Sequence, residues 1–181
     1  ATVAAGCASE APSDVLRQAQ RYSTAVELEA PDLIGQRSLE QLLAERRSVR
    51  EFSATVPALD VSGQLLWAGQ GVTSDEGYRT APSAGALYPL ELFAVTATEL
   101  MHYLPDGHRV ERRGDTATLN VLGDLAFEQE FVSRAPLVVV VTAVPGRTEQ
   151  EYGAVAWDLV NREAGHAAQN ILLQATALGM V

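Results

Sequence analysis

The run from Pro136 to Val144 constrains the fold of this chain more than any other segment. It is almost continuously apolar, is rich in valine and has the length of a β-strand. A half-exposed strand alternates polar and apolar residues, whereas an unbroken apolar run is typical of a central strand buried on both faces. Apolar residues then recur at helical spacing from about Ala154 to Leu178, and Gly179 is a natural C-cap. We therefore expect a covered central strand and a long helix.

The remaining elements are indicated by helix caps, turn residues and hydrophobic alternation. Ser38 and Gln41 form a capping-box pattern, which predicts a helix from Ser38 to about Arg47. Asp60 is expected to cap a second helix that ends at Gly71. We further expect a flexible tail or linker over residues 1–36 with a short helix around Val15–Tyr22, a strand over Leu90–Ala97, a hairpin of Met101–Leu104 and Arg109–Arg113, and a short helix near Val121–Phe131.

Composition excludes several classes of function. The chain has 181 residues and a formal net charge of −10, which fits one globular domain and argues against nonspecific binding to nucleic acid. No run is long and apolar enough to be a transmembrane segment. A single cysteine, Cys7, cannot form an internal disulfide framework or a cysteine-based metal cage. No histidine–carboxylate spacing indicates zinc, so no metal is expected.

Cys7 also bears on where the protein is located. Val3 to Cys7 resembles the end of a bacterial lipoprotein signal, in which a lipid is attached to the cysteine. The other interpretation is an alanine-rich N-terminus with an incidental cysteine. We expect a cytoplasmic protein, and the alternative is a lipid anchor at the cell surface through Cys7.

The cluster Arg46-Arg47-Ser48-Val49-Arg50 is the first candidate site. Guanidinium groups match phosphate oxygens with paired hydrogen bonds, and a serine hydroxyl adds another. The alternative is that these basic residues merely complement the dipole at a helix C-terminus and stay solvated. On its own, the cluster leaves both interpretations open.

The second candidate is the loop from Pro82 to Leu87, which is made of small residues and precedes Tyr88-Pro89. Small side chains leave backbone amides accessible to the edge or face of a flat ring, although such a segment can also be a plain loop. A phosphate site and a ring site together suggest a phosphorylated planar cofactor, and flavin mononucleotide (FMN) is the expected one. His102 and His108 fall in the expected hairpin and are expected at the surface, and His166 is expected to be a structural residue of the long helix.

Four segments that occur in order carry a family resemblance, namely residues 46–52, 65–73, 79–91 and 163–170. They resemble the SagB/ThcOx-type dehydrogenase branch of the nitroreductase superfamily, and the resemblance covers about residues 37–181. It implies an α+β fold with a mixed, mainly antiparallel sheet flanked by helices and a long central helix. It also implies a homodimer with two FMN sites at its interface, and two-electron transfer through the flavin to or from a small organic or peptide-derived substrate.

The resemblance also assigns roles to individual residues. The phosphate and ribityl contacts would be Arg46, Arg47, Ser48 and Arg50. The loop that covers the flavin ring from the other subunit would contain Pro82, Ser83, Ala84, Gly85 and Leu87. Polar contacts near the flavin would come from Gln129 and Gln169, and Tyr152 is the candidate for proton transfer.

This sequence departs from the family pattern at two places. Glu151-Tyr152 stands where peptide-azoline oxidases of this branch have a Lys-Tyr pair, which reverses the local charge. The family also continues past the long helix into a strand and a flavin-contacting segment, so the domain 37–181 is expected to be C-terminally incomplete. The alternative function is therefore a non-catalytic, degenerate or truncated flavin-binding or scaffold protein of a peptide-modification complex. The electron donor stays open among NADH, NADPH and a peptide azoline.

Overall fold

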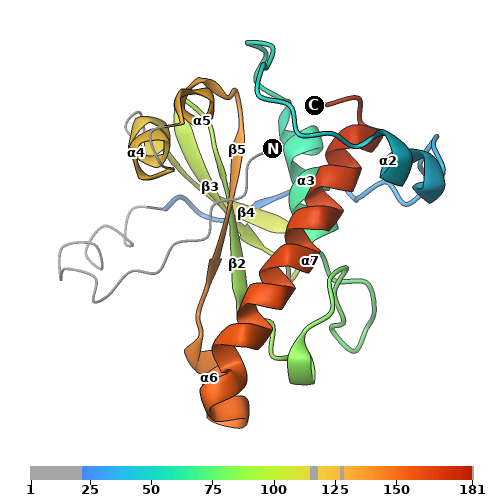
Figure 1. The fold of residues 1–181 in the computed structure, drawn as a ribbon, viewed down its shortest axis with the longest axis vertical. Helices are drawn as coiled ribbons and strands as arrows, with labels where there is room; N and C mark the ends of the chain where they lie inside the picture. The colour runs from blue at the N-terminus through green and yellow to red at the C-terminus, as the bar shows by residue number, and fades with distance from the viewer. Residues whose placement is uncertain (1–21, 115–117, 127–128, 181) are drawn as a thin grey trace.

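The computed structural model describes residues 22–114, 118–126 and 129–180 and is built around one antiparallel sheet. Its strands are ordered β1-β4-β3-β2-β5, and every pairing between these strands is antiparallel. Figure 1 shows the sheet between two groups of helices. The strands span Val26–Glu27 (β1), Leu90–Val95 (β2), Glu99–Leu104 (β3), Arg109–Gly114 (β4) and Val138–Ala143 (β5).

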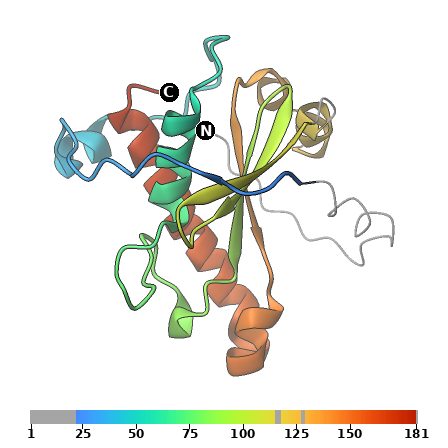
Figure 2. The same ribbon diagram turned by 180° about the vertical axis from the view of Figure 1, so that it is seen from behind.

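Helices cover both faces of this sheet. On one face α3 and α7 pack against the central strands, and on the other α4 and α5 cover one end of the sheet (Figures 1 and 2). The helices span Leu39–Glu45 (α2), Leu59–Gln70 (α3), Thr118–Leu125 (α4), Glu130–Arg134 (α5), Gly146–Tyr152 (α6) and Ala156–Ala177 (α7), with short 3-10 turns at Ala84–Ala86 and Gly153–Val155. The predicted α+β class with a long helix is confirmed.

The strand predicted from Pro136–Val144 exists as β5, but its expected central position is wrong. β5 pairs with β2 and is the last strand in the described sheet. It is nevertheless buried on both faces, because Val139 and Val141 pack toward α3 and α7 while Val138 joins the core beneath α4 and α5. An unbroken apolar run indicates that other layers cover both faces of a strand. It does not indicate whether the strand pairs with one other strand or with two.

The helix ends agree with the sequence in two cases and differ in one. The Ser38 hydroxyl accepts from the Gln41 amide and the Gln41 side chain accepts from the Ser38 amide, so the capping box is confirmed. Gly179 ends α7 with φ of 69°, in the left-handed conformation that glycine adopts without strain. The second helix begins at Leu59 with Ala58 as N-cap, so Asp60 lies in the first turn and is not the cap.

Two further segments differ from the expectation. The helix predicted near Val121–Phe131 is two helices, α4 and α5, which belong to the same small core. In the predicted tail, β1 pairs with β4, and the Asp32 amide donates to Gln64 of α3 at 2.9 Å. Cys7 and nearly all of the helix predicted around Val15–Tyr22 lie outside the described residues, and the 36/37 boundary stays a prediction.

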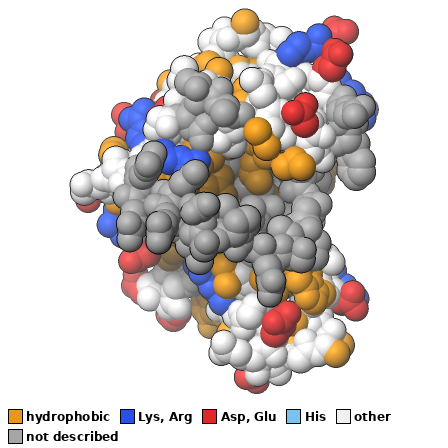
Figure 3. Space-filling view, turned by 90° about the vertical axis from the view of Figure 1, so that its left-hand side faces the viewer, with side chains coloured by type: hydrophobic (Ala, Val, Ile, Leu, Met, Phe, Trp, Pro, Cys, Tyr) orange, Lys and Arg blue, Asp and Glu red, His pale blue; other side chains and the backbone are white. Residues whose placement is uncertain are grey.

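The face that carries α4 displays charged and apolar side chains in small interspersed groups (Figure 3). No helix in the described ranges is both long and apolar enough to cross a bilayer.

Candidate cofactor site

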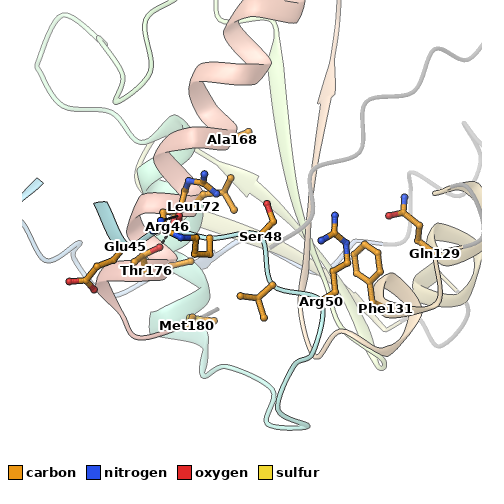
Figure 4. Close-up of a pocket in the computed structure, with 13 residues that line it drawn as sticks. Glu45, Arg46, Ser48, Arg50, Gln129, Phe131, Ala168, Leu172, Thr176 and Met180 are labelled. Atoms are coloured by element: carbon orange, nitrogen blue, oxygen red, sulfur yellow. Dashed lines mark hydrogen bonds between the residues drawn. The ribbon is translucent and has the colours of Figure 1, made fainter. Parts of the chain in front are cut away.

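The arginine–serine cluster lines an open cavity of about 590 Å³ between the segment that follows α2, the start of α5 and the last turns of α7. Figure 4 shows Arg46, Ser48 and Arg50 on one wall, with Gln129 and Phe131 to one side. A volume of this size lies within the roughly 300–1,000 Å³ that is usual for small-molecule sites. The described residues that line it are Glu45, Arg46, Arg47, Ser48, Val49, Arg50, Gln129, Phe131, Ala168, Leu172, Ala175, Thr176 and Met180.

The end of α2 fixes the course of the arginine segment. Arg46 is the C-cap of α2, and its amide donates to the Leu42 carbonyl at 3.0 Å. The Arg47 guanidinium donates to the carbonyls of Ala44 and Arg46 at 2.8 and 2.9 Å. Arg50 places its guanidinium carbon 5.6 Å from the centre of the Phe131 ring, within the range of a cation–π contact. The capping box therefore positions the cluster indirectly, because it begins the helix that ends at Arg46.

The cavity carries a surplus of positive charge. Glu45 is the one acid among the described lining residues, and it forms an ion pair with Arg37, which also donates to the Thr176 carbonyl at 2.8 Å. Within the described ranges no carboxylate forms an ion pair with Arg46, Arg47 or Arg50. A site with unpaired guanidinium groups and a hydroxyl favours a phosphate or another anion.

Small and polar residues form the rest of the wall. α7 contributes Ala168 and Ala175, whose short side chains leave room beside the helix. Gln129 lines the cavity together with the arginine cluster, and its side-chain nitrogen donates to the Ala126 carbonyl at 2.8 Å. Gln169 follows Ala168 on α7 and is half-buried, but it is not part of the lining. Phe131 was missed by sequence reasoning, because one aromatic residue on a short helix carries no signal of its own.

The predicted ring loop does not lie at this cavity in one chain. The Ala84 amide in that loop donates to the Glu163 carboxylate of α7 at 2.9 Å. Leu172 of the cavity wall follows Glu163 by nine positions, which at about 3.6 residues per turn is roughly two and a half turns of helix. The loop and the cavity therefore lie on opposite faces of α7. The loop residues Pro82, Ser83, Ala84, Gly85 and Leu87 are thus separate from the arginine cluster within a single chain.

The structure places Tyr152 with the loop instead of the cavity. Tyr152 is the last residue of α6 and is 36% exposed. A Cβ atom on Gly85 would lie 3.0 Å from the Tyr152 hydroxyl, so the phenol packs directly against the loop backbone. Of the predicted site residues, the arginine cluster and Gln129 are thus brought together, and Tyr152 and the loop form a second group.

Both hairpin histidines differ from the expectation, because His108 is also half-buried, with its Nδ1 2.9 Å from the Tyr103 hydroxyl. His102 was expected at the surface, but it is half-buried and its Nε2 lies 2.8 Å from a Glu91 carboxylate oxygen. Its ring also stacks on Phe93 with centroids 4.6 Å apart. The hydrogen bond to Glu91 raises the pKa of His102 above its ordinary value, with Glu111 adding to the effect against the cost of burial. Among the described residues, no group of histidine, cysteine and carboxylate side chains is arranged to hold a metal ion.

Comparison with known proteins gives the family. The model described as "Nitroreductase family" matches residues 43–181. "Putative nitroreductase MJ1384" of Methanocaldococcus jannaschii is 38% identical over 161 residues, which cover 86% of this chain and 81% of that protein. A protein of Ralstonia eutropha whose crystal structure is assigned to the nitroreductases is 28% identical with a TM-score of 0.75, over 88% of this chain and 77% of its own.

A more distant structure shares the fold. A chain of the Escherichia coli microcin synthetase McbBCD, solved with truncated pro-MccB17 bound, is 20% identical with a TM-score of 0.58 over 96% of this chain and 71% of its own. The likeness at that identity concerns the fold alone. The family model and the Methanocaldococcus relative lead to the same conclusion as the motifs: this chain belongs to the nitroreductase family.

Proposed function

We propose that this protein binds FMN and transfers two electrons through it between organic molecules, as an oxidoreductase of the SagB type. The observation that carries the proposal is the arginine cavity, where guanidinium groups and a serine hydroxyl come from one short segment and no carboxylate of the described residues forms an ion pair with these guanidinium groups. A phosphate monoester is a compact dianion with several acceptor oxygens, which suits that set of donors.

The rest of the cavity suits the remainder of FMN. Phe131 and the short side chains of α7 offer an apolar wall for a flat or carbon-rich group, and Gln129 offers hydrogen bonds. FMN, when bound, supplies the two-electron chemistry. The chain itself would hold the phosphate through Arg46, Arg47, Ser48 and Arg50 and restrict how the rest of the molecule lies.

The separation of loop and cavity supports a homodimer. One chain holds them on opposite faces of α7, so the loop could cover a flavin ring only at the cavity of a second copy. In that arrangement the Tyr152 hydroxyl, which packs against Gly85, would stand beside the partner's ligand. We propose that Tyr152 there holds or moves a proton on the substrate. Gln169, outside the lining of its own cavity, is a further candidate for contact with the ligand.

The proposed substrate is a small organic or peptide-derived molecule. The observation that supports this class is the set of four ordered segments that resemble SagB-type dehydrogenases. NADH, NADPH and an azoline-containing peptide are the electron donors to compare. Glu151 is a carboxylate at a position where azoline oxidases have lysine, so a nicotinamide donor is the better first choice.

Flavin retention tests the proposal. The purified protein should show flavin absorption bands or take up added FMN, and Arg46→Glu or Arg50→Glu should abolish uptake because each replaces an attraction to phosphate by a repulsion. Arg162→Glu makes the same change of charge at an exposed position of α7 outside the cavity and should retain FMN. A colourless wild-type protein that takes up no FMN would refute the proposal, and so would full retention in both cavity variants.

A further inference from the structure

The loop from Ser83 to Tyr88 has an unusual backbone. Gly85, Ala86 and Tyr88 all have positive φ, at 60°, 53° and 46°. Glycine adopts this region freely, whereas alanine and tyrosine do so at a cost and persist there only where their surroundings fix them. Two residues of this kind within three positions imply that something outside the loop holds its shape.

Hydrogen bonds from several elements hold the loop. The Ser83 hydroxyl accepts from the Tyr88 amide at 2.9 Å, which closes the loop on itself. Arg147 of α6 donates to the Tyr88 carbonyl at 3.1 Å. At the other end the Ala84 amide donates to the Glu163 carboxylate at 2.9 Å. The last contact joins Ala84, which directly precedes the left-handed Gly85 and Ala86, to α7.

Glu163 is unusual among these anchors because it is almost fully buried, at 5% exposure. Among the described residues, the Ala84 amide is the one hydrogen-bond donor to its side chain, and no ion pair involves it. Burying a carboxylate is costly unless hydrogen bonds compensate, and a bond from an amide to a charged acceptor is a strong one. The Ala84 amide therefore compensates for the burial of the Glu163 carboxylate, and the carboxylate in turn holds Ala84 in place.

We infer that Glu163 is a positioning residue, which holds Ala84 so that Gly85 stays against the Tyr152 hydroxyl. Gly85 is exposed, and within the described part of the chain its amide has no hydrogen-bond partner, so this loop presents an amide and a phenol side by side to a ligand. That the ligand is the partner subunit's FMN or its substrate rests on the function proposed above. Glu163 and part of the cavity wall belong to the same helix. α7 would therefore also fix the distance between the loop and the arginine cavity of one chain.

The inference is tested with two substitutions at one position. Glu163→Met fills the same space and removes the acceptor, whereas Glu163→Gln keeps an oxygen that can accept from Ala84. Arg162→Met is the matched control at the neighbouring exposed position of α7. Hydrogen exchange of a peptide covering residues 80–90 is measured on protein without flavin. The visible circular dichroism of bound FMN is then measured on each variant.

We expect Glu163→Met to speed exchange in the loop by about tenfold or more, the factor that follows from losing a hydrogen bond to a charged group. It should also change the dichroism of bound FMN, while Glu163→Gln and Arg162→Met stay near the wild type. Unchanged exchange in Glu163→Met would overturn the inference, and so would a Glu163→Gln variant that behaves like Glu163→Met.

A second variant guards against a Glu163→Met protein that does not fold. Ala84→Pro removes the donor and leaves the acid in place, and it is compatible with the backbone because Ser83 is extended and Ala84 begins a 3-10 turn. It should alter the dichroism of bound FMN, and an unaltered spectrum would count against the inference. A wild type that takes up no FMN refutes the proposed function alone, because the exchange measurement needs no flavin.

Discussion

The contact between α3 and α7 can be tested at Gly69, where α3 comes closest to its neighbours. A Cβ atom at this position would lie 2.8 Å from Leu92 Cδ1 and 2.9 Å from Ile171 Cδ1. Both side chains are fully enclosed, at 1% and 0% exposure, so neither can swing into solvent. Gly69→Ala therefore requires Leu92, Ile171 or α3 itself to shift within a filled core, and α7, which carries Ile171, also carries part of the cavity wall and the loop anchor.

The expected cost follows from two opposing effects. Adding a methyl group to a filled core costs about 1–3 kcal/mol, while alanine gains up to about 1 kcal/mol over glycine in a helix and less in the last turn. We therefore expect Gly69→Ala to lower the free energy of unfolding by roughly 1–2 kcal/mol. Ile171→Val removes the Cδ1 atom and alone should cost about 0.5–1.5 kcal/mol. Together the two changes should cost about 1 kcal/mol less than their sum, because the new methyl occupies the vacated space.

Urea unfolding of the wild type, the two single variants and the double variant, followed by circular dichroism, measures these differences. Gly146→Ala is the matched control, since it adds the same methyl group in a helix where, among the described residues, no atom outside the adjoining backbone lies within 4 Å of the new position, and it should change stability by at most about 0.5 kcal/mol. If Gly69→Ala is as stable as the wild type, or if its cost and that of Ile171→Val simply add, then the packing argument is wrong.

Two further predictions concern a titrating histidine and a buried hydroxyl. The hydrogen bond to Glu91 raises the pKa of His102 above 6.5, so its contribution to stability is complete below pH 6.5 and is lost as pH rises through the raised pKa. The urea midpoint of the wild type should therefore decrease as pH rises over that window, and His102→Gln should make this decrease smaller. A His102→Gln variant whose urea midpoint has the same pH dependence as the wild type would contradict this. Thr148 Oγ1 is buried without a hydrogen-bond partner in the described residues. Thr148→Val should therefore raise the free energy of unfolding by about 1 kcal/mol, and a lower urea midpoint would refute it.

Local elements of the fold could be predicted because their signals act over a few residues. The capping box at Ser38, the left-handed end of α7 at Gly179 and the hairpin around Gly107 each depend on chemistry within one or two turns of chain. The same holds for the arginine cluster, whose donors are adjacent in sequence and so must meet at one place. The position of the cluster at the end of α2 could also be predicted, because the capping box marks the start of this short helix and the cluster follows seven residues later.

Properties that depend on distant partners could not be predicted. The apolar run of β5 has the same pattern whether the strand is central or terminal, because burial on both faces comes from the helical layers. His102 looked like a hairpin surface residue, yet Glu91 on the neighbouring strand converts it into a partly buried ion pair. Sequence separation hides such pairs, since strand register decides which side chains face each other.

The sequence by itself determined that three arginines and a serine lie together at Arg46–Arg50 and that a loop of small residues follows them along the chain, and it pointed to the nitroreductase family. Only the tertiary structure decided how the two are related. They lie on opposite faces of α7, and the buried Glu163 ties the loop to that helix at Ala84. The reason is physical: residue types specify what a segment can bind, whereas helix periodicity and the packing of remote elements specify which segments can reach the same ligand.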